Sequence, residues 1–344
     1  MYDRAYGTTM VAENPTSFDE RLVQLRALGE STRLRLIRIL CRGELTVTEL
    51  TSATGLSQPG ISRHMKLLSS AGLAERNQEG AWVFYRQTLP SSLKPLIADL
   101  SDHRLAEDDS RLDRVKAERS ATAARYFAKH APTWDAVRRL QGGSEAGEAA
   151  IRSITERLAQ YHGGRLGRIV DLGTGTGQML DLLSGLYDSA IGFDASAEML
   201  SVARSRLSEV ENVRVRLRDL YELEAGEEGG ADLVLMHHVL HYLADPPAAI
   251  AAAVRLSAEG RVLIADFAPH DREELRTEHA HRRLGFSDAD LDRWARLAGA
   301  SVVESHAVPP NCPNGLIAKL WLIERRTKTS SVLRREVEVR PDAL

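Results

Sequence analysis

A run of alternating glycines follows an apolar segment in the second half of the chain. Residues 171–177 read Asp-Leu-Gly-Thr-Gly-Thr-Gly, and we expect a helix to begin at Gln178. Glycines let the backbone approach a ligand closely, and a helix N-terminus adds N–H donors and the positive end of a dipole. The dinucleotide fingerprint Gly-x-Gly-x-x-Gly does not fit, because Gln178 or Leu180 stands where its third glycine belongs. The pattern is instead Asp-x-Gly-x-Gly-x-Gly.

Two further acidic residues stand at the ends of the next predicted strands. Asp194 follows the apolar run 189–193, and Asp219 follows the run 212–217, just as Asp171 ends the run 167–171. Ligands of open α/β sheets bind in the crevice outside the carboxyl ends of the strands. Each acid could instead simply cap the helix after it, but three acids at three successive strand ends favour a binding site.

Together these motifs resemble those of the class I S-adenosylmethionine-dependent methyltransferases, over about residues 120–325. The resemblance implies S-adenosylmethionine or S-adenosylhomocysteine as the cofactor. It implies that Asp171 and the glycine backbone hold the amino-acid end, that Asp194 accepts hydrogen bonds from the ribose hydroxyls, and that Asp219 and Leu220 bind the adenine. The expected cofactor-binding residues are Asp171, Gly173, Gly175, Gly177, Asp194, Ala195, Met199, Asp219, Leu220 and His237.

Residues that would act on a methyl acceptor are harder to identify. Methyl transfer from a sulfonium is an in-line displacement, so the protein mainly aligns and desolvates the acceptor. A histidine can serve as a general base, although a histidine on a helix face is more often packed or solvated. The helix over 123–134 resembles the lid of such domains, and its aromatic residues could equally be simple core. The catalytic candidates are His238, His241, Tyr242 and His281.

Metal binding is not expected from the sequence. His237 and His241 have the i, i+4 spacing that zinc ligands can have, but no paired carboxylate of obvious geometry accompanies them. Cys41 and Cys312 are the two cysteines, and they lie far apart in the chain. They provide neither a disulfide framework nor a thiolate cluster.

Short helices joined by a glycine turn, followed by a hairpin, are expected in the first quarter of the chain. Such a helix pair places its second member, the recognition helix, in the major groove of DNA. The expected elements are helices from Phe18, from Ser31 as N-cap, over 47–53 after Thr46 as N-cap, and from Ser57 to Gly72, then strands over 73–77 and 81–87.

The predicted recognition helix has one apolar face, formed by Ile61, Met65 and Leu68, which leaves its polar face for DNA. Glutamine pairs well with adenine and arginine with guanine, whereas the histidine and lysine of this helix are expected along the phosphates. Arginines beside the hairpin tip could contact the backbone or the minor groove as a wing. The expected DNA-binding residues are Ser57, Gln58, Ser62, Arg63, His64, Lys66, Arg76 and Arg86.

The segment 25–86 resembles the ArsR type of winged-helix repressors. The resemblance is carried by Leu28-Gly-Glu-Ser-Thr-Arg-Leu-Arg-Leu and by Ser57-Gln-Pro-Gly-Ile-Ser-Arg-His-Met-Lys-Leu-Leu. It implies a homodimer, built on the first helix and on a helix near 91–105, that binds a palindromic double-stranded DNA operator. Many members carry a Cys-x-Cys metal site where this chain has Thr46 and Thr48, whose hydroxyls bind soft metals poorly. Metal sensing at that site is therefore not expected.

The 344 residues are expected to form two domains. An α+β winged helix-turn-helix would precede an α/β, Rossmann-like, seven-stranded class I methyltransferase fold, because strand-like and helical runs alternate from residue 167 and end in a hairpin. The expected ranges are 1–16 for a disordered leader, 17–105 for DNA binding and dimerisation, 106–150 for a helical linker and lid, 151–325 for the cofactor domain and 326–344 for a tail.

The composition is that of an ordinary globular protein, with 43% hydrophobic and 27% charged residues and a net charge of -3. Apolar runs fall short of the roughly 20 residues that a membrane span needs, and the N-terminus lacks the pattern of a signal peptide. These observations predict a cytoplasmic protein without a membrane partner.

Two functions are compatible with this sequence. The first is a transcriptional regulator whose effector is S-adenosylhomocysteine or S-adenosylmethionine, because a ligand that binds two conformations unequally shifts the population that binds DNA. Repressors that resemble this whole arrangement control methionine-cycle genes. The second is a methyltransferase that acts on a small-molecule acceptor and whose DNA-binding domain regulates its own expression.

Overall fold

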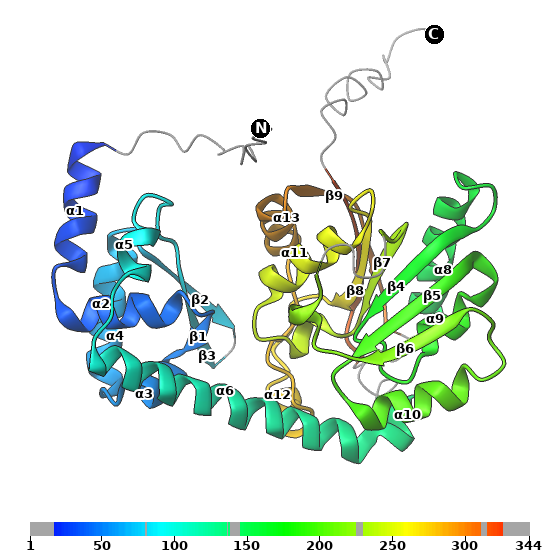
Figure 1. Cartoon of the computed structure of the whole chain (residues 1–344), viewed down its shortest axis with the longest axis horizontal. Helices are drawn as coiled ribbons and strands as arrows, with labels where there is room; N and C mark the ends of the chain where they lie inside the picture. Colours follow the sequence, from blue (N-terminus) through cyan, green and yellow to red (C-terminus); the bar gives the residue numbers. More distant parts are fainter. Residues whose placement is uncertain are drawn as a thin grey trace, which may run out of the picture. The chain divides into compact units, whose positions relative to one another are not determined.

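A computed structural model describes residues 17–79, 81–135, 137, 145–224, 230–310 and 315–325 (Figure 1). The predicted leader and tail, 1–16 and 326–344, lie outside these described residues, as does Cys312. Internal contacts divide the chain into two compact units, 1–117 and 118–344. The division falls within one long helix, α6 (His103–His130), so each unit contains part of that helix.

The first unit is a winged helix-turn-helix, as predicted (Figure 1). Its small antiparallel sheet has the strand order β1-β3-β2. Its elements before α6 are α1 (Phe18–Leu28), α2 (Ser31–Leu40), β1 (Leu45–Thr46), α3 (Val47–Thr54), α4 (Gln58–Ser70), β2 (Ala74–Glu79), β3 (Trp82–Gln87) and α5 (Lys94–Ala98).

Local signals explain where the helices of this unit begin and end. Thr46 caps α3 in a capping box with Glu49, and Gly55 ends the helix in a left-handed conformation with φ 70°. Helix α2, however, has Glu30 as its N-cap, so the prediction of Ser31 was wrong by one residue. The Glu30 carboxylate accepts hydrogen bonds from two backbone N–H groups of the first turn, which a serine hydroxyl could not do as well.

The second unit contains a mixed seven-stranded sheet of the order β6-β5-β4-β7-β8-β10-β9, which confirms the predicted Rossmann-like methyltransferase fold. Strands β4 to β8 are parallel, and β9 and β10 form the expected antiparallel hairpin at one edge. The strands are β4 (Leu166–Leu172), β5 (Tyr187–Asp194), β6 (Val213–Leu217), β7 (Leu233–His237), β8 (Val262–Phe267), β9 (Ala300–Val308) and β10 (Ala318–Arg325).

Helices cover both faces of this sheet and bury two apolar layers. Helices α8 (Glu145–Gln160) and α9 (Gln178–Leu182) share one layer, and α11 (Pro246–Leu256) and α13 (Asp288–Leu297) share the other. Alternate residues of each strand face opposite layers, as Ile169 and Val170 do on β4. The remaining helical elements are α10 (Ala197–Arg206), α12 (Glu274–Glu278), and the 3-10 turns η1 (Ala131–Thr133), η2 (Ser184–Leu186), η3 (Leu220–Glu222) and η4 (Leu240–Tyr242).

Among the described strands, β6 pairs with β5 alone and so forms an edge of the sheet. Arginines alternate with apolar residues along it, and both Arg214 and Arg216 are exposed. Within the described ranges, none of the helices is long and apolar enough to cross a membrane.

Candidate functional site

Helix α4 presents a polar face on the surface of the first unit. Ile61, Met65 and Leu68 are fully buried, as expected from their spacing. The opposite face is therefore available to a partner. Among the predicted DNA-binding residues, those that lie exposed on or just before this helix are Ser57, Gln58, Ser62, Arg63 and Lys66.

Two predicted DNA-binding residues are turned toward other parts of the same unit. His64 is half-buried, and its Nδ1 lies 3.5 Å from the Glu30 carboxylate at the start of α2. Arg86 lies opposite Glu75 across the hairpin and forms an ion pair of 2.6 Å with it. The hairpin turn follows Glu79, so Arg86 lies at the far end of its strand and its predicted place beside the tip was wrong. Arg76 is exposed, and it donates to Gln78 at 2.9 Å.

A buried ion-pair cluster fixes α6 against the helix-turn-helix. Asp108 of α6 is completely buried and accepts two hydrogen bonds of 2.7 Å from Arg35 of α2 and one of 2.8 Å from Arg111. Arg35 also donates to the carbonyl of Thr54, and Arg111 to that of Ala53, at 2.9 Å each. Those carbonyls end α3 just before the turn into α4. We call Arg35, Asp108 and Arg111 the Asp108 cluster.

A cavity of about 380 Å³ opens at the carboxyl ends of β4, β5 and β7 in the second unit. This is the place in an open α/β sheet where the strand order reverses, and its size falls in the range of small-molecule sites. The predicted cofactor-binding residues that line it are Asp171, Gly173, Gly175, Asp194, Ala195, Met199, Asp219, Leu220 and His237. Gly177 does not line it, and instead starts α9 with φ 78°.

Asp171 supplies an unusual carboxylate to this cavity. The residue is 1% exposed, and neither carboxylate oxygen has a hydrogen-bond partner among the described residues. Burial raises the pKa of Asp171 to about 7, and the charge of Asp194 adds to this rise, whereas the nearby Thr174 hydroxyl opposes it. An unpartnered buried acceptor is costly, so the site is suited to a ligand that brings a positively charged donor.

Asp194 organises the glycine loop at the cavity wall. Its two carboxylate oxygens accept the backbone N–H groups of Gly175 and Ser196, each at 2.8 Å. Burial raises the pKa of Asp194, although these backbone donors lower it in part. Each oxygen keeps a second lone pair for a ligand hydroxyl. Gly173 has φ 73°, and a Cβ there would lie 2.3 Å from the Val239 side chain, so glycine is required.

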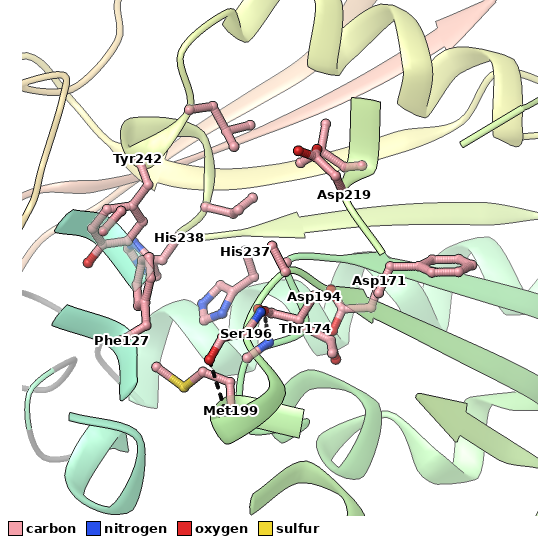
Figure 2. Close-up of a pocket in the computed structure, with 18 of the residues that line it drawn as sticks. Phe127, Asp171, Thr174, Asp194, Ser196, Met199, Asp219, His237, His238 and Tyr242 are labelled. Carbon is pink, nitrogen blue, oxygen red and sulfur yellow. Dashed lines mark hydrogen bonds between the residues drawn. The ribbon is translucent and has the colours of Figure 1, made fainter. Parts of the chain in front are cut away.

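The two ends of the cavity differ in character. Figure 2 shows Phe127, His238 and Tyr242 together at one end and Asp171 and Asp219 at the other, with His237 and Asp194 between them. Asp219 is exposed and accepts the backbone N–H of Tyr221 at 3.0 Å. One end is therefore suited to cationic and hydroxyl groups, and the other to an apolar or aromatic group.

The aromatic end contains part of the expected lid. The ring centroids of Phe127 and Tyr242 lie 4.9 Å apart, and those of Phe127 and Trp134 lie 5.5 Å apart. Burial raises the pKa of Tyr242 well above its usual value, so this phenol remains protonated and is poorly suited to act as a base. Other lining residues lie outside the motifs and the lid helix that the sequence identified, and no local pattern marked them: Arg119, Ser120, Tyr221, Val239, Leu243 and Ala244.

Two of the four catalytic candidates do not reach the cavity. His238 and Tyr242 line it, but His241 and His281 are buried behind its wall at 1% and 2% exposure. His241 donates from Nδ1 to Asp266 at 2.7 Å, and burial lowers the pKa of this imidazole well below its usual value. The ring centroids of His241 and His281 lie 4.1 Å apart. Direct contact of either histidine with a substrate in the cavity is therefore not supported.

Comparisons with known proteins match the two units separately. The family described as "Bacterial regulatory protein, arsR family" matches residues 30–76, and a family described as "Methyltransferase domain" matches 144–305. An arsenic resistance transcriptional regulator of Pseudomonas putida is 38% identical over 97 residues, which cover 26% of this chain and 75% of that protein. The arsenical resistance operon repressor of Escherichia coli is 44% identical over 62 residues, 18% of this chain and 53% of that protein.

Among solved structures, magnesium protoporphyrin IX methyltransferase from Synechocystis, with bound S-adenosylhomocysteine, is similar to the second unit. The match covers 60% of this chain and 100% of that chain, at 18% identity and a TM-score of 0.48. The family match over 144–305 and the seven-stranded sheet show a domain of the methyltransferase type with a Rossmann-like fold. Through its N-terminal winged helix-turn-helix, the chain belongs to the ArsR family of bacterial regulatory proteins.

Proposed function

We propose that this protein is a DNA-binding transcriptional regulator whose methyltransferase domain binds S-adenosylmethionine or S-adenosylhomocysteine as its effector. The observation that carries the proposal is the buried Asp171 carboxylate, which faces the cavity and has no hydrogen-bond partner among the described residues. Both ligands have an α-ammonium group that would satisfy it. Because an ArsR-type DNA-binding domain lies on the same chain, binding of such a ligand would be able to change the affinity for DNA.

The other cavity residues fit the remaining parts of these ligands. Asp194 has free lone pairs for the two ribose hydroxyls, and Asp219 and the backbone of Leu220 can bind the adenine edge. A volume of about 380 Å³ admits a nucleoside with an amino-acid side arm. The sulfur of the ligand would then lie toward the end formed by His238 and Tyr242.

Helix α6 is the element through which ligand binding would reach the DNA-binding unit. Within the first unit its residues Asp108 and Arg111 hold the end of α3, directly before the recognition helix. Within the second unit its residues Arg119, Ala123 and Phe127 line the cavity. A ligand that orders or displaces the second half of this continuous helix would bias the position of the first half.

The same proposal includes a homodimer on a palindromic operator. Apolar side chains of α1 are exposed in the single chain, with Phe18 80%, Val23 49% and Leu25 46% exposed. A second copy that covers them would bury this surface. In sedimentation experiments we expect a dimer for the full chain and a monomer for Leu25→Glu, whereas Leu297→Glu, at an exposed position on α13, should leave the dimer intact.

The decisive experiment measures operator affinity in the presence of each ligand. The operator is recovered from a random DNA library by the full chain, and fluorescence anisotropy follows its binding with S-adenosylmethionine, S-adenosylhomocysteine or neither. We expect one ligand to change the affinity at least about fivefold, the lower range for coupled sites. Asp194→Ala should abolish this response, whereas Asp188→Ala, an exposed acid at the other end of β5, should keep it. If neither ligand changes DNA binding at saturation, the proposal fails.

A second function, methyl transfer to a small acceptor, is favoured by the aromatic end of the cavity. Phe127, Tyr242 and His238 form a wall that could exclude water around an acceptor placed next to the sulfonium. The cofactor supplies the activated methyl group. Incubation of the protein with methyl-labelled S-adenosylmethionine and a cell extract would then label a small molecule, and Asp194→Ala would not label it. Lack of labelling across extracts, together with tight cofactor binding, would support the regulator alone.

A further inference from the structure

A cluster of buried polar side chains lies behind the aromatic end of the cavity. His238, next to the end of β7, His241 on η4 and Asp266 on β8 are 9%, 1% and 0% exposed. One nitrogen or oxygen atom from each of them lies within 4.8 Å of those of the other two. These residues are brought together from separate strand ends, and the proposed binding of an S-adenosyl ligand uses neither His241 nor Asp266.

The hydrogen bonds between His241 and Asp266 leave the second ring nitrogen of His241 unused. Asp266 accepts from His241 Nδ1 at 2.7 Å, from the His241 backbone at 3.2 Å and from the Phe267 backbone at 2.8 Å. The carboxylate therefore fixes the orientation of the imidazole. The other nitrogen of this ring, Nε2, is buried and has no hydrogen-bond partner among the described residues. A buried acceptor without a donor is unfavourable, so this lone pair favours a ligand.

The backbone at His238 is a second observation. This residue has φ 50°, a left-handed conformation that is uncommon outside glycine, although histidine adopts it more often than most other residues do. Strain of this kind is concentrated at functional sites. Here the conformation holds the ring of His238 within 6.2 Å of the ring of His241, measured between centroids, at the wall of the cavity.

Two imidazoles and one carboxylate are a ligand set for a divalent ion of borderline softness such as zinc. Zinc sites with three protein ligands keep a fourth position for water or a substrate atom. A histidine that binds a metal through one nitrogen typically donates from the other to a carboxylate, as His241 does to Asp266. The geometry thus allows Asp266 either to bind the ion itself or to orient His241, and both arrangements require all three residues.

We propose that His238, His241 and Asp266 form a binding site for a divalent transition-metal ion at the aromatic end of the cavity. Since His238 lines the cavity, the open coordination position would face it, where an oxygen or sulfur atom of a bound molecule could enter. The site shares His238 with the wall of the cavity proposed for the effector, whereas His241 and Asp266 do not line that cavity.

The test uses the full chain after treatment with a chelator. Zn²⁺ is added in a calorimeter, and Co²⁺ is added with its visible absorption recorded as a report on coordination number. We expect one ion per chain and a cobalt spectrum of a low-coordinate nitrogen and oxygen site without thiolate bands. His241→Gln and Asp266→Asn should weaken binding by about 100-fold or more, at or beyond the upper range for residues that support a metal site.

Matched controls separate this site from adventitious binding. His306→Gln changes an exposed histidine that also lies beside a carboxylate, that of Glu304, and Cys41→Ser removes an exposed thiol. Both variants should bind the ion as the unmodified protein does. If the His241 variant does not fold, His238→Gln at the cavity wall provides the same comparison. Failure of the unmodified protein to bind one equivalent, or loss of binding in either control, would overturn the proposal.

Discussion

Asp171 combines burial, a missing hydrogen-bond partner among the described residues and a pKa of about 7. Because burial raises the pKa above that of an unfolded aspartate, the carboxyl group in the ligand-free protein is protonated below about pH 7. A ligand ammonium group needs the charged form. We therefore expect the affinity for S-adenosylhomocysteine to fall about tenfold per pH unit below about pH 7 and to level off above it. Calorimetric titrations across this pH range would measure the dependence.

The Asp171→Asn variant tests the origin of this dependence. It should bind the ligand weakly and with little dependence on pH around neutrality, whereas Asp188→Asn should behave as the unmodified protein. The same pKa shift lowers the stability of the ligand-free protein as the pH rises, because the folded protein then holds the proton of Asp171 more tightly than the unfolded chain does. Between about pH 4 and about pH 7, the free energy of unfolding should decrease by up to about 1.4 kcal/mol per pH unit from this group. An affinity that does not vary with pH would contradict the role of Asp171.

At the residue level, the sequence predicted the residues that local patterns mark and missed those that depend on distant contacts. Asp171, Asp194 and Asp219 could be recognised because each stands at the end of an apolar run, and the strands bring them to one cavity. The place of Asp266 beside His241, 25 residues away, depends on the pairing of β7 with β8 and on the course of η4. Asp108 was missed because a single acid within a highly charged helix has no local sign of burial.

Two exposed basic residues of helix α4 are expected to make different kinds of DNA contact, one to bases and one to phosphates. Arg63 and Lys66 are both exposed on it, but Arg63 lies nearer its N-terminal end, which enters the major groove in this class of domain. We expect Arg63→Ala to reduce the free energy of operator binding by about 1–3 kcal/mol and to change the binding of random DNA little. Lys66→Ala should weaken the binding of both DNAs and reduce the salt dependence of the affinity by the equivalent of about one phosphate contact. Anisotropy titrations over a range of salt concentrations would distinguish the two. Equal losses for both variants on both DNAs would contradict these roles.

The Asp108 cluster is expected to hold the helix-turn-helix together. Asp108→Asn removes the charged acceptor shared by Arg35 and Arg111, the two arginines that donate to the carbonyls at the end of α3. Breaking a buried ion pair typically costs about 3–5 kcal/mol. We expect faster hydrogen exchange in the peptides that cover α3 and α4, measured by mass spectrometry of the full chain. Asp113→Asn removes an acid whose side chain is 61% exposed and which pairs with Arg42, so it should change exchange little. Unchanged protection of α3 in the Asp108 variant would show that the cluster does not hold it.

The helices and strands were predicted more accurately than their exact ends and the positions of residues within them. Apolar runs located the seven strands of the sheet, and the spacing of Ile61, Met65 and Leu68 identified the buried face of α4. The error at Arg86 was one of position along the strand, because both the predicted strand 81–87 and the observed pairing of Arg86 with Glu75 put this residue at the end away from the turn. The N-cap of α2 differed by one residue because serine and glutamate can both accept from the first turn.

For the whole molecule, the proposed signal depends on the continuity of α6. Ala117→Pro would interrupt this helix between the Asp108 cluster and the cavity, because proline lacks the N–H donor and clashes with the preceding turn. Ala117 is exposed, so the substitution leaves the core of each unit unchanged. We expect ligand binding and operator binding to persist separately, while the effect of ligand on operator affinity disappears. Ala117→Ser is the control, and it should retain the effect. If the Ala117→Pro variant still responds to ligand, the signal does not pass through α6.

The arginines of β6 have a consequence for the protein in a crowded solution. Among the described strands, β6 has a neighbour on one side only, and a sheet edge of this kind is a template for edge-to-edge polymerisation. Arg214 and Arg216 border that edge, so a second copy that approached in the same way would bring its own guanidinium groups against them. Like charges would oppose this contact and so disfavour growth of the sheet from one copy to the next.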